Sequence, residues 1–369
     1  MKLYDEKYNL VTLSNSFLKY YGVPPFHNTI KEIDELLNKN KYKKIVVILF
    51  DGLGSYIEEK HLKETDIIRK KKFLEITSVF PPTTVAATTS FLSGRYPIET
   101  GWLGWSQYFK EVDRTIDMFS GRDSFTGEIL SPNPSSIYTN YENIISLISK
   151  YNKNVHTDFI SPYGIGNGTA KNLTQFISKI DSEMKKEREH FIYAYWTEPD
   201  SSIHEYGTNH PYVHNIIREI NKMVAKLAKS NKDNLIVILA DHGLVDLSPM
   251  FLNEHEDLYE LIINDSSIDH RAGDFRIKDN KQEEFKTLFN KYYGDEFYLL
   301  TKKEVIDQNV FGLGEKHPHF EDFVGDFLAI SIKDKYICCP KKNEDGLLKG
   351  GHAGGTEEER KISVSIINK

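Results

Sequence analysis

The chain has little of what marks secreted, disulfide-bonded or zinc-ribbon proteins. Its only cysteines among 369 residues are the adjacent Cys338 and Cys339. Neighbouring cysteines seldom bridge each other, and two thiols without a CxxC spacing are weak evidence for a metal site. We therefore expect both to be structural, at the end of an apolar strand.

Signals for membranes and nucleic acids are also lacking. No apolar run approaches the ~20 residues of a membrane span, and the first residues, MKLYDEKYNLVTLSNS, do not follow the pattern of a signal peptide. The net charge of −7 is mild, and acidic residues are interspersed among the lysines. We expect a cytoplasmic protein that binds neither membranes nor nucleic-acid polymers, and the oligomeric state is left open.

Three apolar segments have the pattern of strands buried on both faces, as in a parallel sheet. They are KKIVVILF (43–50), HFIYAYW (190–196) and NLIVILA (234–240). Between and around them lie stretches with apolar residues at helical spacing, at 138–151, 169–188 and 211–229. The alternation predicts an α/β fold, with a largely parallel central sheet sandwiched by helices.

Residues 264–330 interrupt this alternation with charged clusters, a helical pattern at 281–293 and short apolar pieces. We expect them to form a small inserted α+β cap, with residues 1–263 and 331–369 making up the core. DFLAISI (326–332) and KISVSII (361–367) are expected to be late strands of the core.

The most specific motif is WTEPDSSIHEYG at 196–207. Asp200 and His204 are four residues apart, so on a helical turn they face one point. A carboxylate and an imidazole suit zinc, and also manganese or iron. Alone, such a pair is more often a surface or capping pair.

Two more carboxylates follow predicted strands directly. Asp241 and His242 precede Gly243 at the end of one strand, and Asp51 ends another in LFDGLG. In parallel sheets, sites lie at the carboxyl ends of the strands, so Asp51, Asp200 and Asp241 are expected to converge. Individually, DHG also suits a simple turn, and Asp51 also suits a helix cap.

Two further segments offer an imidazole and a hydroxyl. His352 lies between glycines in KGGHAGGTEEER, which permits close approach to a crowded centre but equally suits a mobile loop. In SVFPPTTVAATTSFLSG (78–94) a helix is expected to begin near Thr84, where backbone N–H groups favour a phosphate. The plain alternative is that Thr83 or Thr84 only caps the helix. Together, the five segments supply the donor types of a two-metal phosphoryl-transfer site.

These motifs, in this order, resemble the alkaline phosphatase superfamily, most closely its nucleotide pyrophosphatase/phosphodiesterase branch. The resemblance runs from about Lys44 to His352. It implies the superfamily fold and two divalent cations, most readily Zn²⁺, with Mn²⁺ as the alternative. It also implies a phosphothreonine intermediate. The implied ligands are Asp200, His204 and His352 for one cation, and Asp51, Asp241 and His242 for the other, with Thr84 bound to it as nucleophile.

Two positions concern the substrate. Tyr195 matches a place where this branch offers an aromatic ring to a nucleobase, although packing within a strand is as good an explanation. In GWLGWSQYF, Trp105 stands where the branch has a phosphate-binding asparagine, so Ser106, Gln107 or a backbone N–H takes that task or the substrate differs. The tail HAGGTEEE is closer to the superfamily's phosphomutases.

The leading hypothesis is a hydrolase of small phosphate diesters or nucleotide pyrophosphates. The alternative on the same two-metal platform is a phosphomonoesterase or phosphonate hydrolase. The third is a metal-binding protein that does not catalyse a reaction. Sulfatases are disfavoured because the chain has no CxPxR motif.

Overall fold

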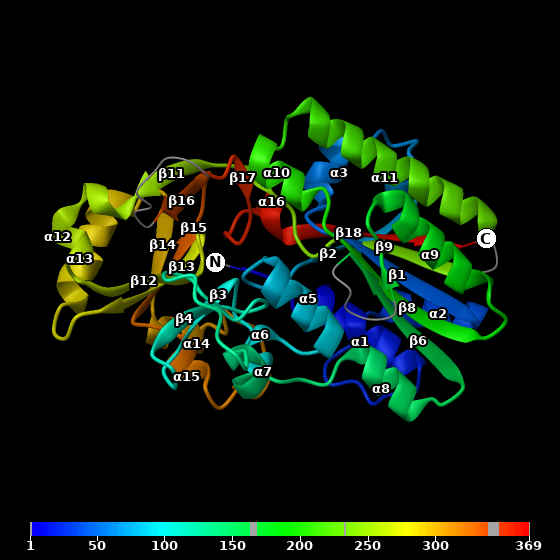
Figure 1. The fold of residues 1–369 in the computed structure, drawn as a ribbon, viewed down its shortest axis with the longest axis horizontal. Coiled ribbons are helices and arrows are strands. Elements are labelled where there is room, and N and C mark those ends of the chain that lie inside the picture. The colour runs from blue at the N-terminus through cyan, green and yellow to red at the C-terminus, as the bar shows by residue number, and fades with distance from the viewer. Residues whose placement is uncertain (1, 163–167, 232–233, 339–346, 369) are drawn as a thin grey trace.

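The computed structural model describes residues 2–162, 168–231, 234–338 and 347–368, and its centre is a seven-stranded sheet in the order β2-β18-β9-β1-β8-β6-β7 (Figure 1). Five of these strands are parallel: β1 (Lys44–Phe50), β6 (Val155–Ser161), β7 (Gly168–Thr169), β8 (Glu189–Trp196) and β9 (Leu235–Leu239). β18 (Lys361–Ile367) runs antiparallel to both β9 and β2 (Lys72–Thr77). The predicted largely parallel sheet is confirmed.

The continuous apolar runs become the buried middle of this sheet. Every residue of β9, and all of β1 except its first residue, is buried. Helices cover both faces, as Figure 1 shows. One layer contains α1 (Leu10–Tyr20), α2 (Lys31–Asn40), α5 (Thr84–Ser93) and α8 (Ile144–Tyr151); the other contains α3 (Ser55–His61), α4 (Ile67–Lys70), α9 (Leu173–Lys185), α10 (Asp200–Tyr206) and α11 (Pro211–Ser230). The helices expected at 169–188 and 211–229 are α9 and α11, whereas the stretch 138–151 forms a helix only from Ile144, because Tyr138 ends the separate short helix α7 (Pro134–Tyr138).

A second seven-stranded sheet, in the order β14-β15-β13-β12-β3-β4-β5, lies beside the first (Figure 1). Its strands are β3 (Ser106–Phe109), β4 (Arg114–Asp117), β5 (Arg122–Asp123), β12 (Ile262–Asp269), β13 (Ala272–Ile277), β14 (Phe297–Thr301) and β15 (Phe327–Ser331). α13 (Gln282–Tyr293) packs on it through Phe285 and Phe289, which belong to a separate apolar core. The remaining short helices are α6 (Pro97–Thr100), α7 (Pro134–Tyr138), α12 (Glu256–Tyr259), α14 (Lys302–Asp307), α15 (Phe320–Phe323), α16 (Glu357–Arg360) and the 3-10 turn η1 (Leu252–Glu254).

The second sheet corrects one expectation. The segment 326–332, expected to be a core strand, is β15 of the second sheet, where it pairs with β13 and β14. All five residues of β15 are buried, so its apolar run looks like that of a central strand. The segment 361–367 is a strand of the central sheet, as predicted. The expected insertion, 264–330, covers only part of the second sheet, because residues 106–123 supply three of its strands.

Two small ladders complete the fold. β10 (Val245–Asp246) pairs with β17 (Gly350–Gly351), and β11 (Ser248–Phe251) pairs with β16 (Lys335–Cys338). Cys338 ends an apolar strand, as expected, while Cys339 lies outside the described residues. Across the described ranges, no helix combines the length and apolar character that crossing a membrane requires.

Candidate metal centre

Three carboxylates meet at the carboxyl edge of the central sheet. Asp51 directly follows β1, Asp241 follows β9, and Asp200 begins α10 after β8. These three strands are neighbours in the sheet. The Asp51 N–H donates to the carbonyl of Trp196 at 2.9 Å, and the Asp200 N–H donates to the Asp51 carbonyl at 3.1 Å. The backbone thus holds the first and second loops together before any side chain is considered.

Glycines allow these loops to approach closely. A Cβ on Gly54 would lie 2.5 Å from the Cα of Gly243, which no real side chain tolerates. Gly52 has φ +72°, and a Cβ there would lie 3.0 Å from the Cβ of Asp200. The glycine after Asp51 therefore makes the tight exit expected from LFDGLG.

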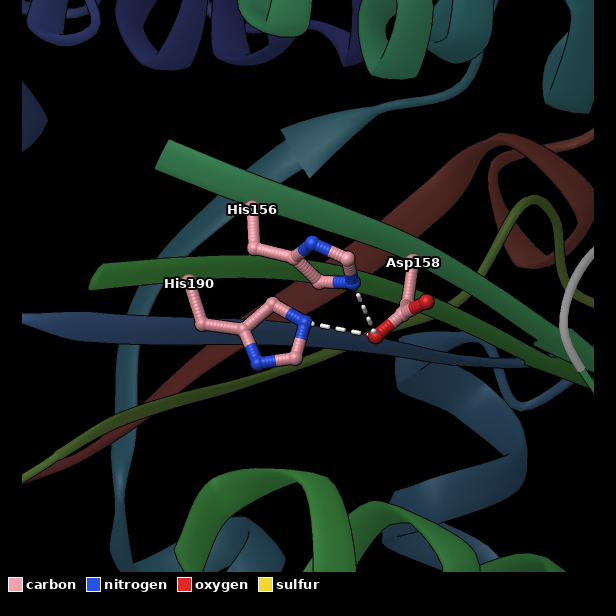
Figure 2. Close-up of side chains that lie close together, drawn as sticks. All are labelled: His156, Asp158 and His190. Carbon is pink, nitrogen blue, oxygen red and sulfur yellow. Dashed lines mark hydrogen bonds and ion pairs between the residues drawn. The ribbon is translucent and has the colours of Figure 1, made fainter. Parts of the chain in front are cut away.

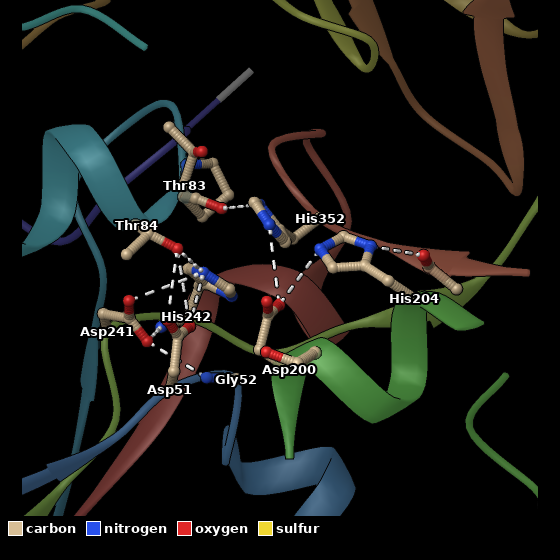
Figure 3. Close-up of polar contacts among 12 residues, drawn as sticks. Asp51, Gly52, Thr83, Thr84, Asp200, His204, Asp241, His242 and His352 are labelled. Atoms are coloured by element: carbon tan, nitrogen blue, oxygen red, sulfur yellow. Dashed lines mark hydrogen bonds and ion pairs between the residues drawn. The ribbon is translucent and has the colours of Figure 1, made fainter. Parts of the chain in front are cut away.

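One ligand set contains Asp200, His204 and His352 (Figure 3). Nε2 of His204 lies 3.3 Å from Asp200 Oδ1, and Nε2 of His352 lies 3.6 Å from the same oxygen. The i, i+4 spacing on α10 thus places both groups at one point. The structure brings together the three residues that the resemblance assigned to one cation.

A second ligand set adjoins the first, with candidate ligand atoms of Asp51, Asp200 and His242 within 4.8 Å of one another. Nε2 of His242 lies 3.4 Å from Asp51 Oδ1 and 3.5 Å from Asp241 Oδ2. Asp241 Oδ1 accepts the N–H groups of Gly52 and His242, each at 3.1 Å. Asp241 Oδ2 is buried and accepts no hydrogen bond from the described part of the chain, as expected of an oxygen that faces a cation.

The three imidazoles are oriented alike. In each ring, Nδ1 lies within hydrogen-bonding distance of a backbone carbonyl oxygen. The distances are 2.8 Å from His204 to Gly350, 3.2 Å from His242 to Gly243, and 3.1 Å from His352 to Pro82. A proton on Nδ1 leaves the Nε2 lone pair directed at the carboxylates, as metal-binding histidines require. The His242 and His352 rings stack with centroids 3.8 Å apart. This donor set fits two divalent cations.

The electrostatics of the site also call for positive charge. Burial, and then the charges of Asp241 and Asp200, raise the pKa of Asp51 well above its usual range. Although burial opposes it, Asp200 raises the pKa of His204 to about 9. Carboxylates this crowded and buried remain ionised together only where a cation offsets their repulsion.

Thr84 lies beside the second set as the first residue of α5, with Thr83 as N-cap. Its Oγ1 lies 3.2 Å from Nε2 of His242, and 3.4 Å and 3.5 Å from the two carboxylate oxygens of Asp51. The side chain of Thr83 makes no capping bond to the helix. The hydroxyl of Thr84 therefore faces the candidate metal ligands at a helix N-terminus.

The two predicted substrate contacts lie differently. The Tyr195 hydroxyl donates a hydrogen bond to Asp51 Oδ2, so this tyrosine contacts a candidate metal ligand. The sequence had indicated contact with a nucleobase or packing within a strand, and neither role included this bond. The Trp105 side chain is 51% exposed and meets Phe119 edge-on, with ring centroids 6.4 Å apart. Of the groups considered in place of the missing asparagine, Gln107 is fully buried and accepts the Leu103 N–H at 3.2 Å.

The second sheet also supplies residues that the sequence did not single out. Asp269, at the end of β12, accepts the Thr83 hydroxyl at 2.9 Å, next to Thr84. Two residues on, the fully buried Arg271 donates from Nε and Nη2 to Glu359 at 2.6 and 2.7 Å. Glu359 in turn accepts the Gly354 N–H of the loop that carries His352 at 2.7 Å. Nothing in the charged composition of 264–330 distinguished these residues.

Comparisons with known proteins agree with this geometry. Residues 45–354 match the family described as type I phosphodiesterase / nucleotide pyrophosphatase. A relative is the rat ectonucleotide pyrophosphatase/phosphodiesterase family member 7, which is 26% identical over 167 residues, or 42% of this chain and 34% of the relative. The match thus spans about a third of that protein.

Solved structures share the fold. Murine ectonucleotide pyrophosphatase / phosphodiesterase 5, an inactive threonine-to-alanine variant in complex with AMP, has a TM-score of 0.64 at 16% identity, covering 88% of both chains. Phosphonoacetate hydrolase from Sinorhizobium meliloti, with phosphonoformate, has a TM-score of 0.64 at 13% identity, covering 88% of this chain and 89% of the other. The family match covers most of the sequence, including every candidate ligand. The chain belongs to the type I phosphodiesterase / nucleotide pyrophosphatase family.

Proposed function

We propose that the chain is a two-metal phosphoryl-transfer hydrolase that cleaves small phosphate diesters or nucleotide pyrophosphates, with Thr84 as nucleophile. The observation that carries the proposal is the position of the Thr84 hydroxyl, 3.2 Å from His242 Nε2 at the head of α5, beside two adjoining ligand sets. The family and the inactive threonine variant of the murine AMP complex support it.

The ligands would be Asp200, His204 and His352 for one cation, and Asp51, Asp241 and His242 for the other. When bound, the cations would offset the carboxylate charge, lower the pKa of the Thr84 hydroxyl and stabilise the leaving oxygen. Zn²⁺ suits these donors, and Mn²⁺ is the alternative.

The chain's own residues define the path of the phosphoryl group. The Thr84 oxygen attacks phosphorus in line, the bond from phosphorus to the leaving oxygen breaks, and a phosphothreonine forms. Water then attacks phosphorus and breaks the bond to Thr84, which restores the hydroxyl. The first-turn N–H groups of α5 lie next to this oxygen and favour the transferring phosphate. The His352 and His204 side chains stay oriented through their Nδ1 contacts.

The test compares bis-(4-nitrophenyl) phosphate with 4-nitrophenyl phosphate, using wild type, Thr84→Ala and Thr84→Ser. We expect faster turnover of the diester and a loss of at least about 10³-fold in Thr84→Ala. We expect partial retention in Thr84→Ser, which keeps a hydroxyl. Chelation should abolish turnover and Zn²⁺ or Mn²⁺ should restore it. Full activity in Thr84→Ala would show that Thr84 is not the nucleophile. A clear preference for the monoester would contradict the assignment as a diesterase.

A second candidate, a phosphomonoesterase or phosphonate hydrolase, rests on Trp105, which stands where the diesterase branch has an asparagine. The structural likeness to phosphonoacetate hydrolase is as high as that to the murine diesterase. Including phosphonoacetate in the substrate panel separates the two candidates, because phosphate release from it requires cleavage of a carbon–phosphorus bond.

A further inference from the structure

A further group of side chains that could hold a metal ion lies at the opposite, amino-terminal edge of the central sheet. His156 and Asp158 come from β6, and His190 comes from β8 (Figure 2). His190 is near the start of its strand, six residues before Trp196, which ends it. At ~3.3 Å per residue, the group lies roughly 20 Å along the strand from the carboxyl edge. It therefore plays no part in the ligand sets of the candidate centre.

Strand register explains why the three side chains meet. His156 and His190 are direct partners in the parallel pairing of β6 with β8. Asp158 is two residues after His156, so its side chain leaves the same face of the sheet. Three ligand residues on one face of two adjacent strands form a preorganised group, because the backbone of both strands is already fixed.

Both imidazoles point the same type of nitrogen at one oxygen. Nε2 of His190 lies 2.6 Å from Asp158 Oδ2, and Nε2 of His156 lies 3.4 Å from it, as Figure 2 shows. The two rings are 4.9 Å apart, edge to face. Two imidazole nitrogens and a carboxylate oxygen are the donors of three-ligand zinc sites, which keep a fourth position for water. The His156 side chain is 42% exposed, so an ion can enter from solvent.

Two neighbouring features bear on ion binding at this group: the Arg188 guanidinium and the burial of His190. Arg188 Nη2 lies 3.6 Å from Asp158 Oδ2 but 3.0 Å from Glu183, so the guanidinium is primarily paired with Glu183. Burial lowers the pKa of His190, which keeps the ring neutral, as metal binding requires. Nε2 of His190 shares a hydrogen bond with Asp158, so an ion bound between them would replace this bond and move the ring proton to Nδ1, which is buried and has no hydrogen-bond partner among the described residues.

We propose that His156, Asp158 and His190 form a third metal site for Zn²⁺ or a similar divalent ion, separate from the candidate centre. The ion would join the amino-terminal ends of β6 and β8. Among the described residues, the neighbour of β6 on its other side is the two-residue strand β7, which pairs with the carboxyl end of β6, so a crosslink would stabilise the amino-terminal end of this edge strand.

The experiment measures zinc content on the full chain. Wild type, His156→Asn and His255→Asn are each equilibrated with Zn²⁺ and separated from unbound metal before elemental analysis. His156→Asn removes an exposed ligand, so the fold is expected to be retained. His255→Asn is the matched control, because His255 stacks on Tyr292 and belongs to no three-ligand group in the described chain.

We expect His156→Asn to bind one Zn²⁺ fewer per chain than wild type and His255→Asn, with phosphodiester turnover unchanged. Zn²⁺ should also raise the unfolding temperature of wild type more than that of His156→Asn. Equal zinc content in wild type and His156→Asn would overturn the proposal. Because the readout is a difference of one ion, it is independent of whether the proposed catalytic centre loads: the counts would be three and two, or one and zero.

Discussion

Replacing Arg271 with methionine removes the guanidinium charge that pairs with the buried carboxylate of Glu359. Both side chains are fully buried, and Arg271 makes two contacts with Glu359 and one each with the carbonyls of Lys333 and Lys335, all at 2.6–2.7 Å. Removing one partner of such a pair costs about 3–5 kcal/mol, because the other charge stays buried without compensation. Methionine fills most of the volume, so charge and hydrogen bonding dominate the loss.

The expected shift in the unfolding temperature follows from chain length. An entropy of unfolding of about 2 cal/mol/K per residue gives about 0.8 kcal/mol/K for 369 residues. A loss of about 4 kcal/mol then lowers the unfolding temperature by about 5 °C. Arg271→Lys keeps the charge but loses the planar fork, so an intermediate loss is expected. Calorimetry on the metal-free proteins measures this effect without a contribution from bound ions.

The same substitution should reach the candidate metal centre. Glu359 also accepts the Gly354 N–H at 2.7 Å and the Thr356 hydroxyl at 2.6 Å, and thereby shapes the loop that carries His352. Loss of such support around a metal ligand typically lowers metal affinity 10- to 100-fold. We expect Zn²⁺ binding to weaken by that factor in Arg271→Met, measured by competition with a chelating dye.

A matched control is Lys281→Met, which breaks an exposed pair with Glu284 at 2.6 Å. Surface pairs of this kind contribute about 0–1 kcal/mol, so neither unfolding nor Zn²⁺ affinity should change much. If Arg271→Met unfolds at the temperature of wild type and binds Zn²⁺ equally well, then the ion pair neither stabilises the fold nor supports the His352 loop.

Two further predictions concern other buried carboxylates. Burial raises the pKa of Glu58 from 4.5 to about 8, although a hydrogen bond from Ser363 lowers it. Between pH 4.5 and 8, the Glu58 carboxyl is therefore protonated in the folded chain and ionised in the unfolded chain. Stability should fall as pH rises from 4.5 to 8, and Glu58→Gln should be more stable than wild type at pH 9 by on the order of 2–4 kcal/mol. The same difference in urea midpoint between the two proteins at pH 5 and at pH 9 would contradict this. Asp269→Asn weakens the bond that holds the Thr83 hydroxyl, so kcat for a diester should fall about tenfold, with KM and unfolding little changed. An unchanged kcat would show that the start of α5 is positioned without Asp269.

The central sheet was predictable from the sequence because its physical requirement is local. A strand buried on both faces needs a continuous apolar run, and β1, β8 and β9 each have one. The carboxylates after these strands converge once the strands are parallel neighbours, so the three aspartates follow from the same pattern. The helical position of Thr84 followed from the Pro-Pro bend before it.

The second sheet was not predictable in the same way, because its order depends on pairing between distant segments. β12 pairs with β3 through Ile268 and Ser106, which are 162 positions apart in the sequence. β15 has the same apolar pattern as a central strand, so composition alone could not assign it to a sheet. The partners of Asp269 and Arg271, Thr83 and Glu359, are also distant in the sequence, so a local pattern could not indicate either residue.

The two sheets therefore contribute different parts of the candidate site. The central sheet provides the three carboxylates, each in the segment that follows one of its strands, whereas His352 follows β17 of a small separate ladder. The second sheet contacts the residues next to the centre: Asp269 accepts the Thr83 hydroxyl, and Arg271 donates to Glu359. Ile268 of β12 also pairs with Ser106, the residue after Trp105. Trp105 directly precedes β3 of the second sheet and is not one of the candidate ligands, so substitutions at Trp105 are expected to change substrate preference and to leave metal binding unchanged.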